Sequence, residues 1–244
     1  MKKLFTLVAI AVTLISTAQE STLLRLNYNV GDTYVITAIT IMGQAGETTM
    51  NMQIDMDMVV KEAKDSVYNV EMGITAIKMD MNTAGMDMSY DSSMSEEDMD
   101  ETGKAMHTQF SPMFEATIYN TLTSRAETVI TKVEPNIPGV DKFTESAGTV
   151  VYPKEEVKVG SSWTINKLEN GMDMEMVYTV KSIDKENVMV DISGTISLMA
   201  EGTISGSMEI NRATGNVNKA IMNMNMAVEG QQMEINVTMT SKKM

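Results

Sequence analysis

Residues 50–60 read Met-Asn-Met-Gln-Ile-Asp-Met-Asp-Met-Val-Val, and this stretch decides the fold. Every even-numbered residue from Met50 to Met58 is apolar, whereas the residues between them are Asn, Gln or Asp. Side chains of a β-strand alternate between two faces, so this period of two predicts a strand with one apolar and one wet face. On a helix, successive even positions rotate by about 200°, which would scatter the methionines around the circumference.

The same alternation returns along most of the chain. Residues 172–176 read Met-Asp-Met-Glu-Met and residues 222–226 read Met-Asn-Met-Asn-Met, and turn signals separate the alternating segments. This arrangement is typical of an antiparallel meander. The predicted strands are Thr33–Met42, Glu47–Val60, Ser66–Met81, Phe114–Asn120, Glu127–Val133, Ser161–Asn166, Gly171–Ile183, Asn187–Leu198, Gly202–Ile210, Asn216–Val228 and Gln231–Ser241.

One predicted strand carries an irregularity, and one segment breaks the strand pattern. In Ser66–Met81 the apolar positions change from even to odd numbers after Ile74, which predicts a β-bulge near Gly73–Ala76 that would also curve the sheet. Residues 95–110 begin with Ser95 and Asp98, whose spacing resembles the capping box of a helix N-terminus. Their apolar residues fall on one helical face before Pro112. We expect a helix there, and a solvated acidic loop is the alternative.

Two parts of the chain resemble each other. Residues 30–36 read Val-Gly-Asp-Thr-Tyr-Val-Ile, and residues 159–165 read Val-Gly-Ser-Ser-Trp-Thr-Ile. Each copy precedes a turn and a Met-x-Met strand. Two copies are too few for a solenoid, so they favour two sheet-forming halves that close on one core. We therefore predict a single β-rich domain over residues 19–244, with halves at about 22–91 and 150–241 and a helical insert near 95–110.

The strand openers, the long amphipathic strands and the helical insert before Phe114 carry a resemblance to a known family. Together with Gly206-Ser-Met-Glu-Ile and its turn at Thr214-Gly215, they resemble a family of exported bacterial β-rich proteins of unknown function over most of residues 24–240. The resemblance implies an architecture similar to lipoprotein-carrier half-barrels and lends no catalytic residues. The expected fold class is mainly antiparallel β (α+β), a curved sheet or incomplete barrel of about ten to twelve strands with one covering helix.

The first eighteen residues predict the compartment. Lys2 and Lys3 precede an apolar stretch from Leu4 to Ile15, and Ser16-Thr-Ala supplies small residues before Gln19. This is the pattern of a secretory signal peptide, and its apolar stretch is too short to span a bilayer. We expect an exported, soluble protein of the periplasm or the extracellular space, with no stable membrane anchor. The alternative is a buried N-terminal helix.

Composition excludes several classes of function. The formal net charge of −14 disfavours binding to nucleic acid. A chain with no Cys and a single His, His107, offers little for nucleophilic catalysis and contains no Gly-x-Ser-x-Gly elbow. An EF-hand-like run at residues 98–103 lacks the acidic twelfth residue, because Gln109 occupies that position. We expect no enzyme and no cofactor, and the sequence leaves protein partners open.

The 27 methionines are the unusual chemical feature. Met side chains could simply fill an apolar face, they could re-pack around an apolar small molecule or lipid, or their thioethers could bind a soft ion such as Cu(I). Binding of an apolar small molecule or lipid is our first hypothesis. Copper binding and a structural envelope role without a ligand are the alternatives. Trp163 is expected to be a packing anchor more than a ligand contact. The candidate ligand-binding residues are Met50, Met52, Met56, Met58, Met174, Met176, Met222, Met224, Met226 and Trp163.

Overall fold

The computed structural model describes residues 20–244 except 45–46, 84–85, 138–139, 141–149, 170, 199–200 and 229. The secretory signal predicted for residues 1–18 therefore lies outside the described residues. Within the described part, no helix is long and apolar enough to cross a membrane.

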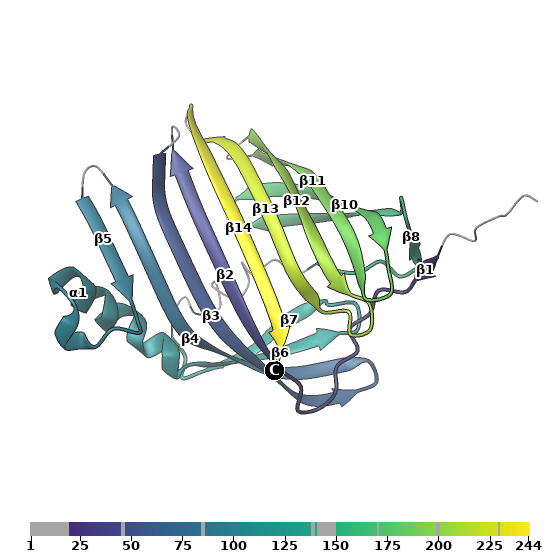
Figure 1. Ribbon diagram of the computed structural model, residues 1–244, viewed down its shortest axis with the longest axis horizontal. Helices are drawn as coiled ribbons and strands as arrows, with labels where there is room; N and C mark the ends of the chain where they lie inside the picture. The colour runs from purple at the N-terminus through teal and green to yellow at the C-terminus, as the bar shows by residue number, and fades with distance from the viewer. Residues whose placement is uncertain are drawn as a thin grey trace, which may run out of the picture.

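A twelve-stranded antiparallel sheet that does not close on itself dominates the molecule (Figure 1). Its order is β7-β6-β4-β3-β2-β14-β13-β12-β11-β10-β9, and β5 also pairs with β4. A separate small sheet joins β1 (Ser21–Thr22) to β8 (Val157–Lys158). The large sheet comprises β2 (Thr33–Gln44), β3 (Glu47–Lys64), β4 (Val67–Thr83), β5 (Met86–Asp91), β6 (Thr117–Thr123), β7 (Thr128–Glu134), β9 (Ser162–Glu169), β10 (Met172–Ile183), β11 (Asn187–Leu198), β12 (Glu201–Asn211), β13 (Val217–Val228) and β14 (Gln231–Lys243).

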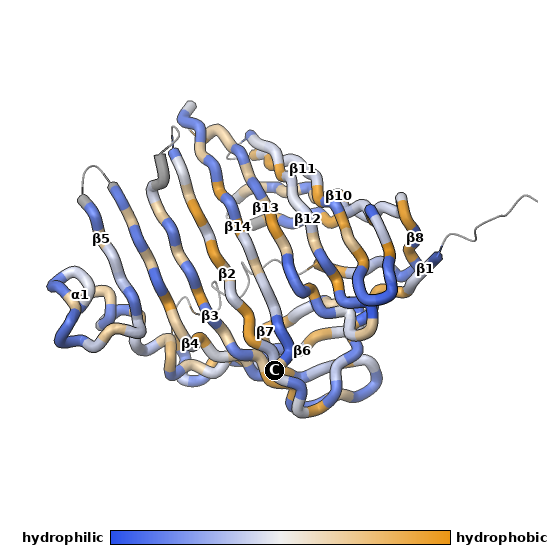
Figure 2. Tube along the Cα trace, in the orientation of Figure 1, coloured by the Kyte–Doolittle hydropathy of each residue, from blue (hydrophilic) through white to orange (hydrophobic). Residues whose placement is uncertain are grey.

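The predicted period of two is confirmed by burial along the strands. In β3, Ile54, Met56 and Met58 are buried, whereas Asp57 between the two methionines and Asn51 nearer the start of the strand are exposed. Hydropathy alternates in the same way along most of the long strands (Figure 2). The even-numbered residues of β2 and β3 lie opposite one another in register, so their side chains share the inner face of the sheet.

The bulge predicted near Gly73–Ala76 is present. Asp55 pairs with Ala76 and Met56 with Ile74, so Thr75 is the extra residue of β4. On both sides of this bulge, β4 uses the same edge for different partners: residues 67–73 pair with β6, and residues 78–83 pair with β5. A bulge bends its strand and increases the local twist. The sheet divides here, and β6 and β7 turn across the inner face.

The predicted helix is present but starts later than expected. A 3-10 turn, η1 (Glu96–Asp98), precedes α1 (Glu101–Phe110), whose N-cap is Asp100 with a carboxylate that accepts the Gly103 N–H. A second 3-10 turn, η2 (Ser111–Glu115), follows directly and contains Phe114, so β6 begins at Thr117 rather than at Phe114. The helix packs beside β5 at one end of the sheet (Figure 1).

The two strand openers have the same backbone geometry. Gly31 and Gly160 have φ values of 89° and 87°, in the region that favours glycine. The N–H of Gly31 donates to the Val60 carbonyl at 2.8 Å, and the N–H of Gly160 donates to the Val180 carbonyl at 2.8 Å. The openers therefore attach β2 to β3 and β9 to β10 in the same way. The extension of this likeness to two whole halves stays a prediction.

Two apolar cores lie on the inner face. The larger one joins β9 to β13 with the ends of β2, β3 and β4 and with two crossing segments, around Leu26 and Tyr152. The smaller one lies between β3, β4 and the helical insert, and includes Tyr90 and Phe110. The region between them, beneath β6 and β7, holds the candidate site.

Candidate functional site

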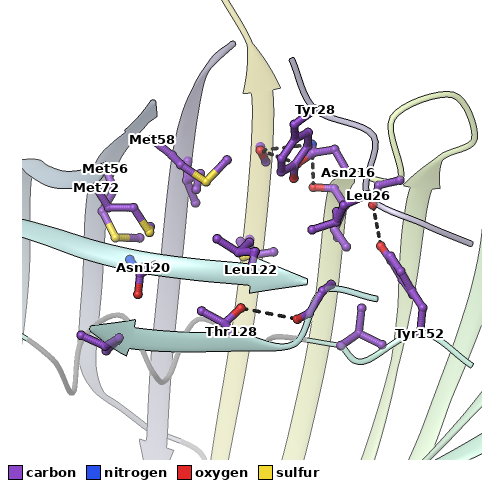
Figure 3. A pocket seen from close by; sticks show the side chains of 18 of the residues that line it. Leu26, Tyr28, Met56, Met58, Met72, Asn120, Leu122, Thr128, Tyr152 and Asn216 are labelled. Carbon is purple, nitrogen blue, oxygen red and sulfur yellow. Dashed lines mark hydrogen bonds between the residues drawn. The ribbon is translucent and has the colours of Figure 1, made fainter. Parts of the chain in front are cut away.

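A cavity of about 470 Å³ lies between the inner face of the sheet and the crossing strands β6 and β7. In Figure 3 these two strands pass in front of the long strands of the sheet. Most of the side chains around the cavity are apolar. The lining residues are Leu26, Tyr28, Ile36, Met56, Met58, Met72, Asn120, Leu122, Ala126, Thr128, Ile130, Val150, Tyr152, Lys167, Leu168, Gly215, Asn216, Val217, Met239 and Ser241.

Thioether side chains form one wall of the cavity. Met56 and Met58 are 1% and 5% exposed, and Met58 lies directly opposite Met72 in the β3–β4 pair. Figure 3 shows these three side chains grouped at the same end of the cavity as Asn120. Met239 joins the lining from β14. Unbranched thioethers adapt to irregular shapes, so this wall can adjust to what it contacts.

Crossing segments close the opposite end of the cavity. Leu26 donates its N–H to the Ser124 carbonyl at 2.7 Å and accepts the Tyr68 hydroxyl at 2.8 Å. The Tyr152 hydroxyl donates to the Gly215 carbonyl at 2.6 Å. A Cβ on Gly215 would lie 2.0 Å from the Arg25 carbonyl oxygen, so only glycine allows the two segments to approach this closely.

A satisfied hydrogen-bond network belongs to this closed end. The Tyr28 hydroxyl donates to Asn216 Oδ1 at 3.1 Å, and Asn216 Nδ2 donates to Ser241 Oγ at 3.2 Å. Burial raises the pKa of Tyr28 well above its usual range, and burial also raises the pKa of Tyr152. Both phenols are therefore neutral hydroxyl donors, because desolvation disfavours the charged form.

Asn120 is the polar exception in the wall formed by β6. Its side chain is 3% exposed, and its Nδ2 atom has no hydrogen-bond partner among the described residues. Ile118 and Leu122 lie on either side of it on the same face of the strand, and Val70 lies directly opposite on β4. Apart from this amide nitrogen, the β6 wall of the cavity is apolar.

The predicted ligand-binding residues separate into three groups. Met56 and Met58 line the cavity. Met174, Met176 and Met226 are buried in the larger core, and Met222 and Met224 pack partly buried against it. Met50 and Met52 pack partly buried against the smaller core. The structure thus places all of these methionines on the inner face and brings two of them to the cavity.

Trp163 packs, partly buried, against the larger core and does not line the cavity. Its ring stacks on Tyr178, with centroids 5.3 Å apart and an angle of 13° between the planes. Its buried Nε1 has no partner among the described residues. This position is compatible with the packing role expected for Trp163 from its place in the strand opener.

The sequence analysis missed the cavity residues outside the methionine clusters. Leu26, Tyr28 and Tyr152 belong to irregular segments, whose positions no periodicity predicts. The sequence does mark Asn120, because it is a polar residue between Ile118 and Leu122 at alternating positions of a predicted strand. Such a residue interrupts an apolar face and marks a position for closer inspection.

Other chemistry in the described residues is limited. No group of three His, Cys, Asp or Glu side chains there could hold a metal ion, although thioethers lie outside that set. His107 Nδ1 lies 3.2 Å from the Tyr90 hydroxyl on the helix side of the sheet. Burial raises the pKa of Tyr90, and nearby Asp91 adds to this effect. Neither residue lines the cavity, and Tyr90 belongs to the smaller core.

The geometry can be compared with known proteins. Residues 141–243 match a family of unknown function, DUF6263. The comparison with curated proteins finds no match. Among solved structures, lipovitellin is similar, in a structure that describes its lipid–protein interactions, with a TM-score of 0.55 and 9% sequence identity. The similarity covers 88% of this chain and spans a quarter (25%) of the lipovitellin chain. At this identity the likeness concerns the fold, a large antiparallel sheet.

Proposed function

We propose that this chain is an exported, non-enzymatic binding protein that holds an apolar ligand, a lipid acyl chain, in the methionine-lined cavity. The observation that carries the proposal is the cavity of about 470 Å³ beneath β6 and β7. Small-molecule sites are usually concave and mostly apolar, with volumes of about 300–1,000 Å³ and a few polar groups. This cavity has those properties.

Two further observations support the proposal. Lipovitellin, whose lipid–protein interactions are described in its structure, shares the architecture of the sheet. The flexible thioethers of Met56, Met58 and Met72 suit a ligand of variable shape, as Met-rich surfaces do for varied partners. The signal peptide predicted over residues 1–18 supports export to a compartment where a lipid-binding protein could serve the envelope.

A filling substitution tests the cavity. Thr128 of β7 lines it, whereas the next residue, Val129, is 63% exposed on the other face. The fluorescent probe N-phenyl-1-naphthylamine should bind the wild type and Val129→Trp with equal affinity. Thr128→Trp should weaken binding by more than about tenfold, because the indole occupies the space of the probe. Equal binding to all three proteins, or no binding to the wild type, would contradict the proposal.

Native mass spectrometry then identifies the natural ligand. We expect protein purified from its own envelope to carry an organic adduct with the mass of an acyl lipid, and Thr128→Trp to lose it. Copper adducts would instead favour the soft-metal alternative, for which Met56, Met58 and Met72 supply three neighbouring thioethers (Figure 3).

A further inference from the structure

Asn120 presents an unused donor to the cavity. Of the lining residues, it is the one with a buried side-chain polar atom that lacks a hydrogen-bond partner within the described part of the chain. Buried polar groups are nearly always hydrogen-bonded, and each exception calls for an explanation. An unpaired amide N–H₂ is costly in apolar surroundings, and a leucine, which has the same branching at Cγ, would avoid this cost.

The other polar groups of the lining already have partners. The network of Tyr28, Asn216 and Ser241 is closed on itself, and the Tyr152 hydroxyl donates to a main-chain carbonyl. Thr128 Oγ1 donates to the Ala126 carbonyl at 3.4 Å. Lys167, the charged residue of the lining, also has an interaction of its own. These groups already have partners, so the donor of the lining that lacks a hydrogen-bond acceptor is Asn120 Nδ2.

Asn120 also lies at a defined place in the cavity. It is beside Met56 and Met72, whereas Tyr28, Asn216 and Tyr152 lie at the opposite end (Figure 3). Leu122, two residues further along β6, lies between the two ends (Figure 3). A ligand atom bonded to Asn120 would therefore be followed by an apolar path along Leu122 and Met58 toward the closed end.

We propose that Asn120 Nδ2 donates a hydrogen bond to the carbonyl oxygen of a neutral acyl group, an ester or an amide, whose hydrocarbon chain lies along this path. The inference rests on the proposed function and narrows its ligand class. A neutral amide donor can bond a carbonyl oxygen without bringing a charged group into the cavity. An ionised carboxylate would need a paired cation to compensate for its burial. Asn120 carries no charge, and Lys167, the cation of the lining, already has an interaction of its own.

Displacement of N-phenyl-1-naphthylamine tests this inference with methyl oleate, oleate and the hydrocarbon 1-octadecene. Asn120→Leu removes the donor and keeps the branching of the side chain at Cγ. Thr121→Val changes the next residue of β6, whose hydroxyl donates to Asn69 on the exposed side of the sheet, and serves as the matched control. We expect the preference for methyl oleate over the hydrocarbon to fall about tenfold in Asn120→Leu, equivalent to about 1.4 kcal/mol, and to be unchanged in Thr121→Val.

The outcomes separate the inference from the proposed function. An unchanged preference in Asn120→Leu would overturn the role of Asn120 while the cavity remained a binding site. Tighter binding of oleate than of methyl oleate at neutral pH would reject the neutral acyl class. If none of the three compounds displaced the probe from the wild type, the proposed function itself would fail.

A second measurement keeps the inference testable if Asn120→Leu does not fold. Methyl oleate labelled with ¹³C at its carbonyl has an infrared band that moves to lower frequency when the oxygen accepts a hydrogen bond. We expect this shifted band for the ester bound to the wild type and to Thr121→Val. A bound ester with the band position that it has in hexane would show a carbonyl without a donor, and would overturn the inference.

Discussion

The two strand openers begin β2 and β9, which pair with β3 and β10. These two partner strands match in register but differ in surroundings. Ile36 lies opposite Met56 after the first opener, and Ile165 lies opposite Met176 after the second. Met56 lines the cavity, whereas Met176 is enclosed in the larger core and accepts the Tyr178 hydroxyl at its sulfur, 3.6 Å away. The same local pattern therefore borders a cavity after the first opener and a filled core after the second.

The residues across the strands differ between these regions. Between β3 and β4 methionine often faces methionine, as in the pairs Met50–Met81, Met52–Met79 and Met58–Met72. After the second opener three methionines face glycine, in the pairs Met176–Gly194, Met226–Gly202 and Met222–Gly206. A long side chain opposite glycine can fill the space that a second side chain would take. The alternation along a strand thus determines on which face of the sheet a methionine lies. The residues opposite it on the neighbouring strands determine how fully that face is packed.

The largest expected effect comes from truncating the two matched methionines. Met176→Ala should lower the free energy of unfolding by about 3 kcal/mol, because it opens a new cavity in a filled core. Met56→Ala should cost less, about 1–2 kcal/mol, because its side chain already borders empty space and has fewer contacts to lose. Urea unfolding of both variants without ligand measures the difference. Equal losses would mean that the two regions are packed alike.

An intermediate effect comes from two buried tyrosines, one in β2 and one in β10. Burial raises the pKa of Tyr34 and the pKa of Tyr178 to about 12. Below pH 10 both phenols are neutral in the folded and unfolded chains, but between pH 10 and 12 only the unfolded chain loses these protons. Stability should therefore fall as pH rises through this window, by roughly 1.4 kcal/mol per pH unit for each tyrosine.

The phenylalanine variants assign this loss of stability to the two tyrosines. Tyr34→Phe and Tyr178→Phe should each flatten the fall, because Phe does not titrate. Urea midpoints recorded from pH 9 to pH 11 provide the measurement. A wild type whose midpoint is constant over this range would show that the phenols are not desolvated as the structure indicates.

The smallest expected effect tests the openers themselves. Asp32 Oδ2 accepts the N–H of Asn29 at 3.0 Å, and Ser161 Oγ accepts the N–H of Lys158 at 3.0 Å. Asp32 also pairs with Lys243 at 2.6 Å. Asp32→Ser should keep the first bond, lose only the ion pair, and cost about 1 kcal/mol or less.

This variant has a simple control. Lys243→Ala should cost a similar amount, and the double variant should cost no more than either single one, since both remove one interaction. Thermal unfolding at low and high salt measures these values, and salt should reduce the difference from the wild type. A loss of several kcal/mol from Asp32→Ser would mean that serine cannot replace aspartate in this turn and that the two openers differ after all.

Much of the fold could be predicted from the sequence because it depends on local alternation. The strands, the bulge at Thr75 and the helix all have signals within a few residues of themselves. The start of the helix was misjudged, since Asp100 rather than Ser95 caps it. Phe114 was assigned to a strand because its apolar character fits both a strand and the 3-10 turn in which it lies.

The cavity could not be predicted in the same way. It requires β6 and β7 to cross the inner face and Leu26 to meet Ser124, and both depend on contacts between distant parts of the chain. Of the ten candidate residues, the cavity contains Met56 and Met58, which share their pattern with methionines of the solid core. The sequence therefore identified the inner face correctly but could not divide it into filled and hollow regions.

The central position of β14 has a consequence for how the molecule assembles. It pairs with β2, so the last long strand joins the first one in the middle of the sheet. During synthesis, β2 and β13 must wait with unpaired edges until residues 231–243 have left the ribosome. Such long-range pairing slows folding and exposes strand edges to aggregation. A chain that stops before residue 231 would leave β2 and β13 with unpaired edges, which promote aggregation, where the native protein has a continuous sheet.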